Sequence, residues 1–131
     1  MNIRKVTPLF VVDAITPAEI TFWEKTGWKK LVEVPHGDHI GFVLLENEGR
    51  ELMLQTRASV KADLATQDIA ALDPPCALYV DVASLVEARS ECLAAGARVV
   101  IDERETVYGA RELWVVDPAG VLVGYAELKN A

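Results

Sequence analysis

The sequence predicts an α+β protein built from two βαβββ modules within a single domain, residues 1–131. Three observations support this fold class. The chain has 131 residues, which is the usual size of one domain. Hydrophobic residues make up 51% and charged residues 25%, a globular composition that excludes disorder and low complexity. Finally, one pattern of strand, helix and three further strands occurs twice along the chain.

Each half of the chain begins with a β-type run that is followed by a capped helix. The two β-type runs are residues 9–13 and residues 78–81. The two helices each start at a capping box and end at a glycine, namely 16–19 with Gly27 and 84–87 with Gly96. Thr16 and Ser84 are separated by almost the same number of residues as the two glycines. This shared offset predicts an internal repeat.

Three more β-type segments follow the glycine in each half, separated by turn residues. They are residues 30–34, 40–46 and 51–56 in the first half, and residues 98–102, 112–116 and 121–128 in the second. The predicted boundaries are residues 6–57 for module 1, 58–75 for a linker and 76–128 for module 2. Val60, Leu64, Ile69 and Leu72 predict a short helix in the linker, and Pro74 and Pro75 mark the end of the linker.

Charge and cysteine content restrict the partners. Thirteen Lys and Arg against twenty Asp and Glu give a net charge of −7. An acidic surface repels phosphate backbones and anionic lipid, so we expect neither nucleic acid nor a membrane as partner, while a cationic small molecule is favoured. Cys76 and Cys92 are too few for a disulfide framework, and the apolar run 6–12 is too short to span a membrane. A cytoplasmic location is therefore expected.

The end of the chain carries the most specific motif. Residues 108–127 read YGARELWVVDPAGVLVGYAE, in which an aromatic-Gly-x-Arg strand runs into Asp-Pro-x-Gly and a last strand. This motif and the segment ELMLQ at 51–55 resemble the vicinal oxygen chelate superfamily, which includes glyoxalase I, extradiol dioxygenases and bleomycin-resistance proteins. The resemblance covers nearly the whole chain. It is specific for the fold but not for the function, because this fold hosts isomerases, dioxygenases, thiol transferases and drug-binding proteins.

The resemblance implies that each module curls into a half-barrel, with its helix on the convex side and its ligand on the concave side. It also implies a homodimer with clefts bounded by the partner subunit. Alternation along residues 51–55 then assigns the faces. Leu52 and Leu54 are expected to pack on a helix, while Glu51, Met53 and Gln55 are expected to line the cavity.

Metal-dependent members of the superfamily place four ligands on the first and last strands of the two modules, usually His, Glu or Gln. The corresponding positions here are Val6, Pro75 (Cys76 if shifted by one), Gly124, and Glu51 or Gln55. Val, Pro and Gly side chains cannot coordinate a metal. We therefore predict no metal and no cofactor. His36 and His39 are read as parts of a solvated turn around Gly37 rather than as a zinc site.

Aromatic and charged side chains near the predicted cavity are the candidate ligand contacts. An aromatic ring offers a stacking surface for a planar or cationic ligand, and an arginine offers a carboxylate clamp. The sequence leaves open which face of 111–116 lines the cavity, and Arg111 has an intermodule salt bridge as its alternative role. The candidate ligand-binding residues are Phe42, Glu51, Met53, Gln55, Tyr108, Arg111 and Trp114.

Three functions follow as hypotheses. The first is a metal-free small-molecule binding protein of the glyoxalase/bleomycin-resistance type, with an apolar, aromatic or cationic ligand held in a concave cleft. The second is a lyase or isomerase that uses Glu51 as a general base or an atypical metal site. The third is a structural or interaction dimer without a ligand.

Overall fold

The computed structural model describes residues 1–64 and 73–129. In chain order the described elements are β1 (Ile3–Val12), α1 (Pro17–Lys25), β2 (Lys29–His36), β3 (His39–Asn47), β4 (Arg50–Thr56), α2 (Arg57–Asp63), β5 (Cys76–Val82), α3 (Leu85–Ala94), β6 (Arg98–Glu105), β7 (Ala110–Val116) and β8 (Leu122–Leu128). The predicted α+β class is confirmed. Residues 65–72, the remainder of the predicted linker helix region, lie outside the described part.

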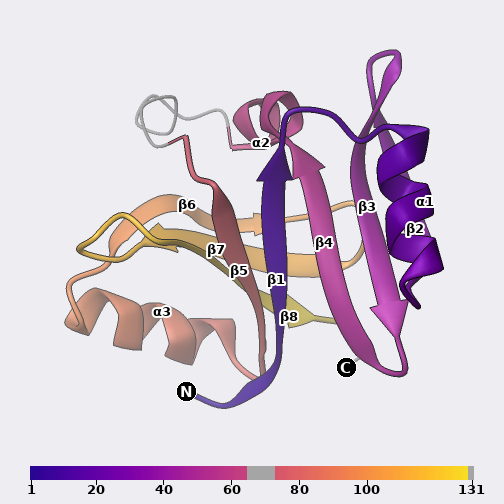
Figure 1. The fold of residues 1–131 in the computed structure, drawn as a ribbon. Coiled ribbons are helices and arrows are strands. Elements are labelled where there is room, and N and C mark those ends of the chain that lie inside the picture. The colour runs from indigo at the N-terminus through magenta and orange to yellow at the C-terminus, as the bar shows by residue number, and fades with distance from the viewer. Residues whose placement is uncertain (65–72, 130–131) are drawn as a thin grey trace.

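The described strands form one mixed sheet in the order β2-β3-β4-β1-β5-β8-β7-β6 (Figure 1). In the middle of the sheet β1 and β5 pair in antiparallel orientation. Each of these central strands has a parallel neighbour on its other side, β4 beside β1 and β8 beside β5. The first and second halves of the chain therefore occupy the two halves of one sheet.

The capping residues found in the sequence begin the two longer helices. Thr16 accepts a hydrogen bond from the Glu19 N–H at 3.2 Å, and Ser84 accepts one from the Glu87 N–H at 3.1 Å. Each contact satisfies one of the unpaired N–H groups at a helix start. After α1, Gly27 has a φ of 105°, a left-handed conformation that costs glycine little. The predicted helix starts and stops therefore agree with the structure.

Both central strands are longer than their predicted β-type runs. The sequence pattern limited them to residues 9–13 and 78–81, whereas β1 begins at Ile3 and β5 begins at Cys76. The extra length comes from pairing between the two strands, from Ile3 opposite Val82 to Phe10 opposite Cys76. Polar residues such as Lys5 hide this pairing in the sequence, because tertiary contacts rather than local preference extend the strands.

Two helices cover one face of the sheet, which we call the outer face. Helix α1 covers apolar residues of β3 and β4, and helix α3 covers apolar residues of β5 and β7. The buried strand residues on this face are Val43, Leu45, Leu52, Leu54, Val80, Val82, Leu113 and Val115. The expectation that Leu52 and Leu54 pack on a helix face agrees with this core.

Helix α2 lies on the opposite face, which we call the inner face. Its Thr56 cap accepts a hydrogen bond from the Ser59 N–H at 3.2 Å. Val60 and the following Leu64 are buried in a cluster with residues of β1, β5, β7 and β8, among them Leu9 and Trp114. The segment predicted as a linker therefore supplies part of the inner core.

None of the helices in the described ranges has the length and apolarity needed to span a membrane. His36 and His39 are exposed and face each other across the turn at Gly37. Within residues 1–64 and 73–129, no group of three or more His, Cys, Asp and Glu side chains is arranged to hold a metal ion.

Candidate functional site

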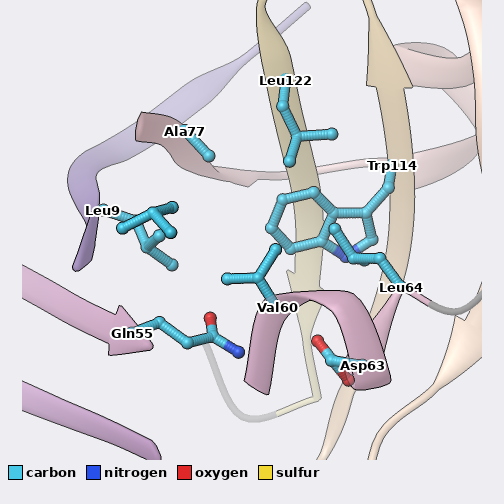
Figure 2. A pocket seen from close by; sticks show the side chains of 9 residues that line it. Leu9, Gln55, Val60, Asp63, Leu64, Ala77, Trp114 and Leu122 are labelled. Atoms are coloured by element: carbon cyan, nitrogen blue, oxygen red, sulfur yellow. The ribbon is translucent and has the colours of Figure 1, made fainter. Parts of the chain in front are cut away.

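A pocket lies between α2 and the inner face of the sheet (Figure 2). The space left free among its side chains is about 10 Å³, room for about one water molecule. The lining residues come from β1, β4, α2, β5, β7 and β8 and are Leu9, Val11, Gln55, Val60, Asp63, Leu64, Ala77, Trp114 and Leu122. The pocket thus joins the two halves of the sheet, with α2 as its cover.

The pocket walls are mostly apolar, and two polar side chains interrupt them. Figure 2 shows the Trp114 ring beside Leu64, with Gln55 and Asp63 on the α2 side. The Gln55 amide donates a hydrogen bond to the Ser59 hydroxyl at 3.0 Å. An apolar enclosure with a few polar groups is the usual composition of a small-molecule site.

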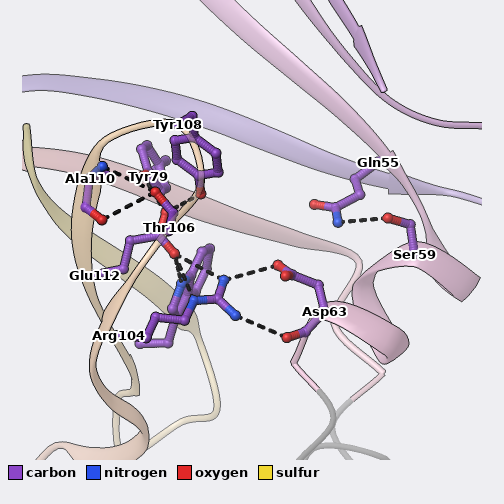
Figure 3. A network of polar contacts seen from close by, with 10 residues as sticks. Gln55, Ser59, Asp63, Tyr79, Arg104, Thr106, Tyr108, Ala110 and Glu112 are labelled. Carbon is purple, nitrogen blue, oxygen red and sulfur yellow. Dashed lines mark hydrogen bonds and ion pairs between the residues drawn. The ribbon is translucent and has the colours of Figure 1, made fainter. Parts of the chain in front are cut away.

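A buried carboxylate holds Trp114 in place. This carboxylate belongs to Glu112, and Figure 3 shows it with Tyr79, Tyr108 and Arg104 around it. Glu112 is fully buried on the inner face of β7. One of its oxygens accepts hydrogen bonds from the Trp114 indole N–H at 3.0 Å and from Arg104 Nε and Nη2 at 3.0 and 2.9 Å. The other accepts from the hydroxyls of Tyr79 and Tyr108. We call these five residues the Glu112 network.

Charge and burial fix the protonation of this network. Burial, and then the negative charge of Glu112, raise the pKa of Tyr79 and of Tyr108 well above the usual range. Both hydroxyls therefore stay protonated and donate hydrogen bonds to the carboxylate. Burial lowers the pKa of Arg104, but hydrogen bonds and charge attraction from Asp63 and Glu112 outweigh it, and the net pKa is raised. Arg104 supplies the positive charge that makes a buried carboxylate tolerable.

Because its acceptor positions are taken, Glu112 orients its neighbours rather than acting as a base. Its main effect on the pocket is the position of the indole. The Trp114 ring lies against Gly124 of β8, where a Cβ atom would come within 2.6–2.7 Å of three ring atoms. Glycine is therefore required at position 124 while Trp114 is present.

This contact bears on the metal site that the resemblance implies. Gly124 is the last-strand ligand position, and the space beside it is filled by the indole. Val6 and Cys76 lie on the outer face, since each pairs with an outer-face residue, Val80 or Phe10. Glu51, the remaining carboxylate, forms an ion pair with Lys5 at 2.9 Å. Val6 and Gly124 offer no side-chain donor, and Glu51 and Gln55 already contact Lys5 and Ser59, so this set of residues does not fit a divalent ion.

The residues proposed from the sequence fall into three places. Gln55 and Trp114 line the pocket, and Tyr108 belongs to the Glu112 network. On the inner face of the first half, Phe42 pairs with Gln55 across β3 and β4, and Glu51 and Met53 lie on the same face as Gln55. Arg111 lies on the outer face with Leu113 and contacts Glu103 at 3.5 Å. Its partner is in the second half of the chain, so this contact is not intermodule.

Sequence reasoning missed the centre of the site. Glu112 lies within the segment 111–116, whose cavity face the sequence leaves open, and the sequence does not single out Tyr79, Arg104 or Asp63. The one local signal is an acid alternating with apolar residues, because Glu112 shares its face with Trp114 and Val116. A carboxylate on a buried strand face needs partners, and those partners come from other elements.

Neither a protein-family model nor a curated protein matches the sequence. Solved structures match in fold. A glyoxalase/bleomycin resistance protein/dioxygenase superfamily member from Vibrio splendidus 12B01 gives a TM-score of 0.65 at 16% identity, over 96% of this chain and 99% of that one. Methylmalonyl-CoA epimerase from Mycobacterium tuberculosis gives 0.64 at 20% identity, over 97% and 87%.

A methylmalonyl-CoA epimerase from Streptomyces coelicolor, in complex with 2-nitronate-propionyl-CoA, gives a TM-score of 0.68 at 15% identity, over 98% of this chain and 96% of that one. At such identities the likeness establishes the fold alone. The chain therefore has the fold predicted from its C-terminal motif, that of the vicinal oxygen chelate superfamily.

Proposed function

We propose that this protein is a metal-free small-molecule binding protein whose ligand lies on the inner face of the sheet. In this proposal the two βαβββ halves act as half-barrels, and the ligand occupies the pocket beneath α2. The observation that carries it is the apolar pocket, with one wall formed by the Trp114 ring and fixed by the Glu112 network. A binding site needs side chains whose rotamers are fixed by packing and by supporting hydrogen bonds, and the Glu112 network fixes the Trp114 ring in this way.

The chemistry of the walls supports an apolar ligand. Six of the lining side chains are aliphatic (Leu9, Val11, Val60, Leu64, Ala77 and Leu122), and Trp114 adds a flat ring. Burial of apolar ligand surface against such walls contributes roughly 25 cal/mol per Å². The polar groups at the edge, Gln55 and Asp63, orient a ligand without forming a catalytic group. The Lys5–Glu51 ion pair likewise occupies the only carboxylate proposed as a base.

A fluorescence screen tests the proposal. Replacing Trp23 and Trp28 with Phe leaves Trp114 as the only tryptophan, so its emission reports on the pocket. Apolar metabolites and antibiotics are then screened for a change in Trp114 emission and in Tm. We expect hits that raise Tm, as binding to the folded state requires.

Two variants make the screen specific. Gln55→Phe places a ring at the pocket edge and is expected to abolish binding of the hits, whereas Val6→Phe places the same ring on the outer face and is expected to leave it unchanged. Retained binding in Gln55→Phe contradicts the proposed site. Native mass spectrometry of protein purified without chelator provides the metal test, and a stoichiometric divalent ion contradicts the metal-free assignment.

A further inference from the structure

We propose that α2 imitates the ligand, and that the ligand is an apolar carboxylic acid whose carboxylate replaces that of Asp63 on Arg104. This inference rests on the proposed function and specifies its ligand class. The helix presents two apolar side chains, Val60 and the adjoining Leu64, to the apolar inner face. It also presents the Asp63 carboxylate to the guanidinium of Arg104. Together these groups have the chemistry of an amphiphilic acid.

The contact between α2 and the sheet is a two-point clamp on Arg104 (Figure 3). Arg104 Nη1 donates to the main-chain carbonyl oxygen of Asp63 at 3.0 Å, and Nη2 donates to Asp63 Oδ2 at 3.1 Å. Asp63 is also a lining residue of the pocket. A ligand carboxylate that takes the place of Asp63 would therefore face the same two nitrogen atoms.

Arg104 keeps its position when Asp63 leaves. Its Nε and Nη2 atoms remain bonded to the buried Glu112, which the two tyrosines and Trp114 hold from the other sides. The outward edge of the guanidinium is thus preorganised for a carboxylate, the group that it binds best in a forked geometry. A cationic ligand would instead meet a positive charge at this end of the pocket.

Helix α2 is suited to be displaced from the inner face of the sheet. It has only seven residues, and an isolated helix of that length is not stable in water. Its last residue carries a negative charge at the helix C-terminus, where the helix dipole disfavours it. The Asp63 side chain is 46% exposed, so solvent screens its ion pair with Arg104. The clamp is therefore weak enough to be displaced.

The size of the pocket requires such a displacement. With α2 in place, the space left free among the lining side chains is only about 10 Å³. Ligand sites usually measure about 300–1,000 Å³. Moving Val60 and Leu64 off the inner face would expose Leu9, Trp114 and Leu122 to an apolar chain. The ligand would then cover the same apolar residues that α2 covers.

The test compares three ten-carbon probes below their micellar concentrations: decanoate, decanol and decylammonium. Binding is measured by Trp114 emission in the protein with Trp23 and Trp28 replaced by Phe. We expect decanoate to bind more tightly than decanol, and decylammonium more weakly than either. Asp63→Asn removes the competing carboxylate and is expected to raise the decanoate-to-decanol affinity ratio about two- to five-fold, the range for an exposed ion pair.

The matched control is Asp102→Asn. Asp102 pairs with Arg89 of α3 at 2.8 Å, its side chain is about as exposed as that of Asp63, and neither Asp102 nor Arg89 lines the pocket. Asp102→Asn changes the net charge by the same amount as Asp63→Asn, and we expect it to leave the decanoate-to-decanol affinity ratio unchanged. Arg104→Lys is a second variant and should lower the ratio, although loss of a Glu112 partner can impair folding. For that reason the result for Asp63→Asn decides the test.

The outcomes separate this inference from the proposed function. A higher ratio in Asp63→Asn, with Asp102→Asn unchanged, supports the inference. Equal affinities for decanoate and decanol, unaffected by Asp63→Asn, overturn the carboxylic-acid inference while the apolar binding function stands. No binding of any probe, together with no hit in the wider screen, overturns both.

Discussion

Glu112 shows how one residue can determine the shape of a site without touching a ligand. Its carboxylate is fully buried and accepts hydrogen bonds from four side chains on four different segments. Such a group is stabilising only while every partner is in place, because each unmet donor in a buried site is costly. The Trp114 wall of the pocket therefore depends on Glu112.

Replacing Glu112 with Gln tests this dependence. The substitution removes the charge that balances Arg104. It also places an amide NH₂ group, which is itself a donor, opposite the side chains that donate to Glu112. We expect a loss of about 2–3 kcal/mol in the free energy of unfolding, since Arg104 retains Asp63 and some solvent. Denaturant unfolding measures it. Glu103→Gln is the control, because its pair with Arg111 is longer and more exposed, and a loss equal to that of Glu112→Gln would contradict the burial argument.

A second residue pair tests the assignment of faces on β4. Leu54 is buried against the α1 side, so Leu54→Ala is expected to cost about 2–5 kcal/mol as a cavity mutation. Gln55 lies at the pocket edge, so Gln55→Ala is expected to cost less than about 1 kcal/mol. Midpoints of denaturant unfolding distinguish the two. If Gln55→Ala proves the costlier change, the inner and outer faces have been exchanged.

Gly124 offers a third test at this scale. A methyl group at this position would enter the Trp114 ring, so Gly124→Ala is expected to destabilise by about 1–3 kcal/mol. Trp114→Leu in the same chain should relieve that part of the cost. A double-mutant cycle measures the coupling, and additive effects of the two changes would show that the ring and the glycine are independent.

At the scale of elements, the ends of α1 and α3 could be predicted because their signals are local. A cap, an acid three residues later and a closing glycine specify a helix without reference to the rest of the fold. The face of β7 could not be assigned in this way. Arg111 and Glu112 begin two alternating sets, each containing apolar residues, and only the packing of α3 on Leu113 and Val115 decides between them.

The position of α2 depends on contacts between distant parts of the chain. Val60 and Leu64 predicted a short helix in the linker, but nothing near them in sequence specifies which side of the sheet it covers. That choice is made by partners such as Arg104, which is 41 residues away from Asp63. The candidate site could be predicted only in part for the same reason. Strand alternation places Gln55 on the cavity side and leaves Trp114 on one of two possible faces of β7, and it does not indicate the Glu112 network.

The cap of α3 provides a prediction for an element. Ser84→Ala removes the acceptor for the Glu87 N–H and is expected to lower the free energy of unfolding by about 1 kcal/mol. The exposed Ser90 of the same helix is the matched control, since alanine there improves helix propensity. Thermal unfolding of the two variants gives the comparison. Equal Tm values would mean that the cap does not stabilise α3.

At the scale of the whole molecule, the centre of the outer face is uncovered. Figure 1 shows β1 and β5 between α1 and α3. On these strands Val6, Phe10 and Leu78 are 48%, 44% and 40% exposed. Among the described strands, β2 and β6 lie at the two edges of the sheet. Exposed apolar faces and sheet edges are both features that association can cover.

We therefore retain homodimer formation as a prediction and expect a two-chain mass in sedimentation at micromolar concentration. Phe10→Asp tests whether the outer face takes part, since a charge at a paired apolar surface is strongly disfavoured. Phe22→Asp is the control for added charge, because Phe22 of α1 is also exposed. A monodisperse monomer of the unmodified chain would contradict the prediction.

The contact between Trp114 and Gly124 also has an evolutionary consequence. A carboxylate cannot be gained at position 124 by one substitution, because its side chain would overlap the indole. Removing Trp114 first leaves a cavity and takes one hydrogen-bond donor away from Glu112, so that intermediate is also destabilised. The two sites are therefore epistatic: a lineage moving between this sequence and one with an acid on the last strand must pass through a less stable ancestor. A designer who wishes to install a metal here has to change both residues together.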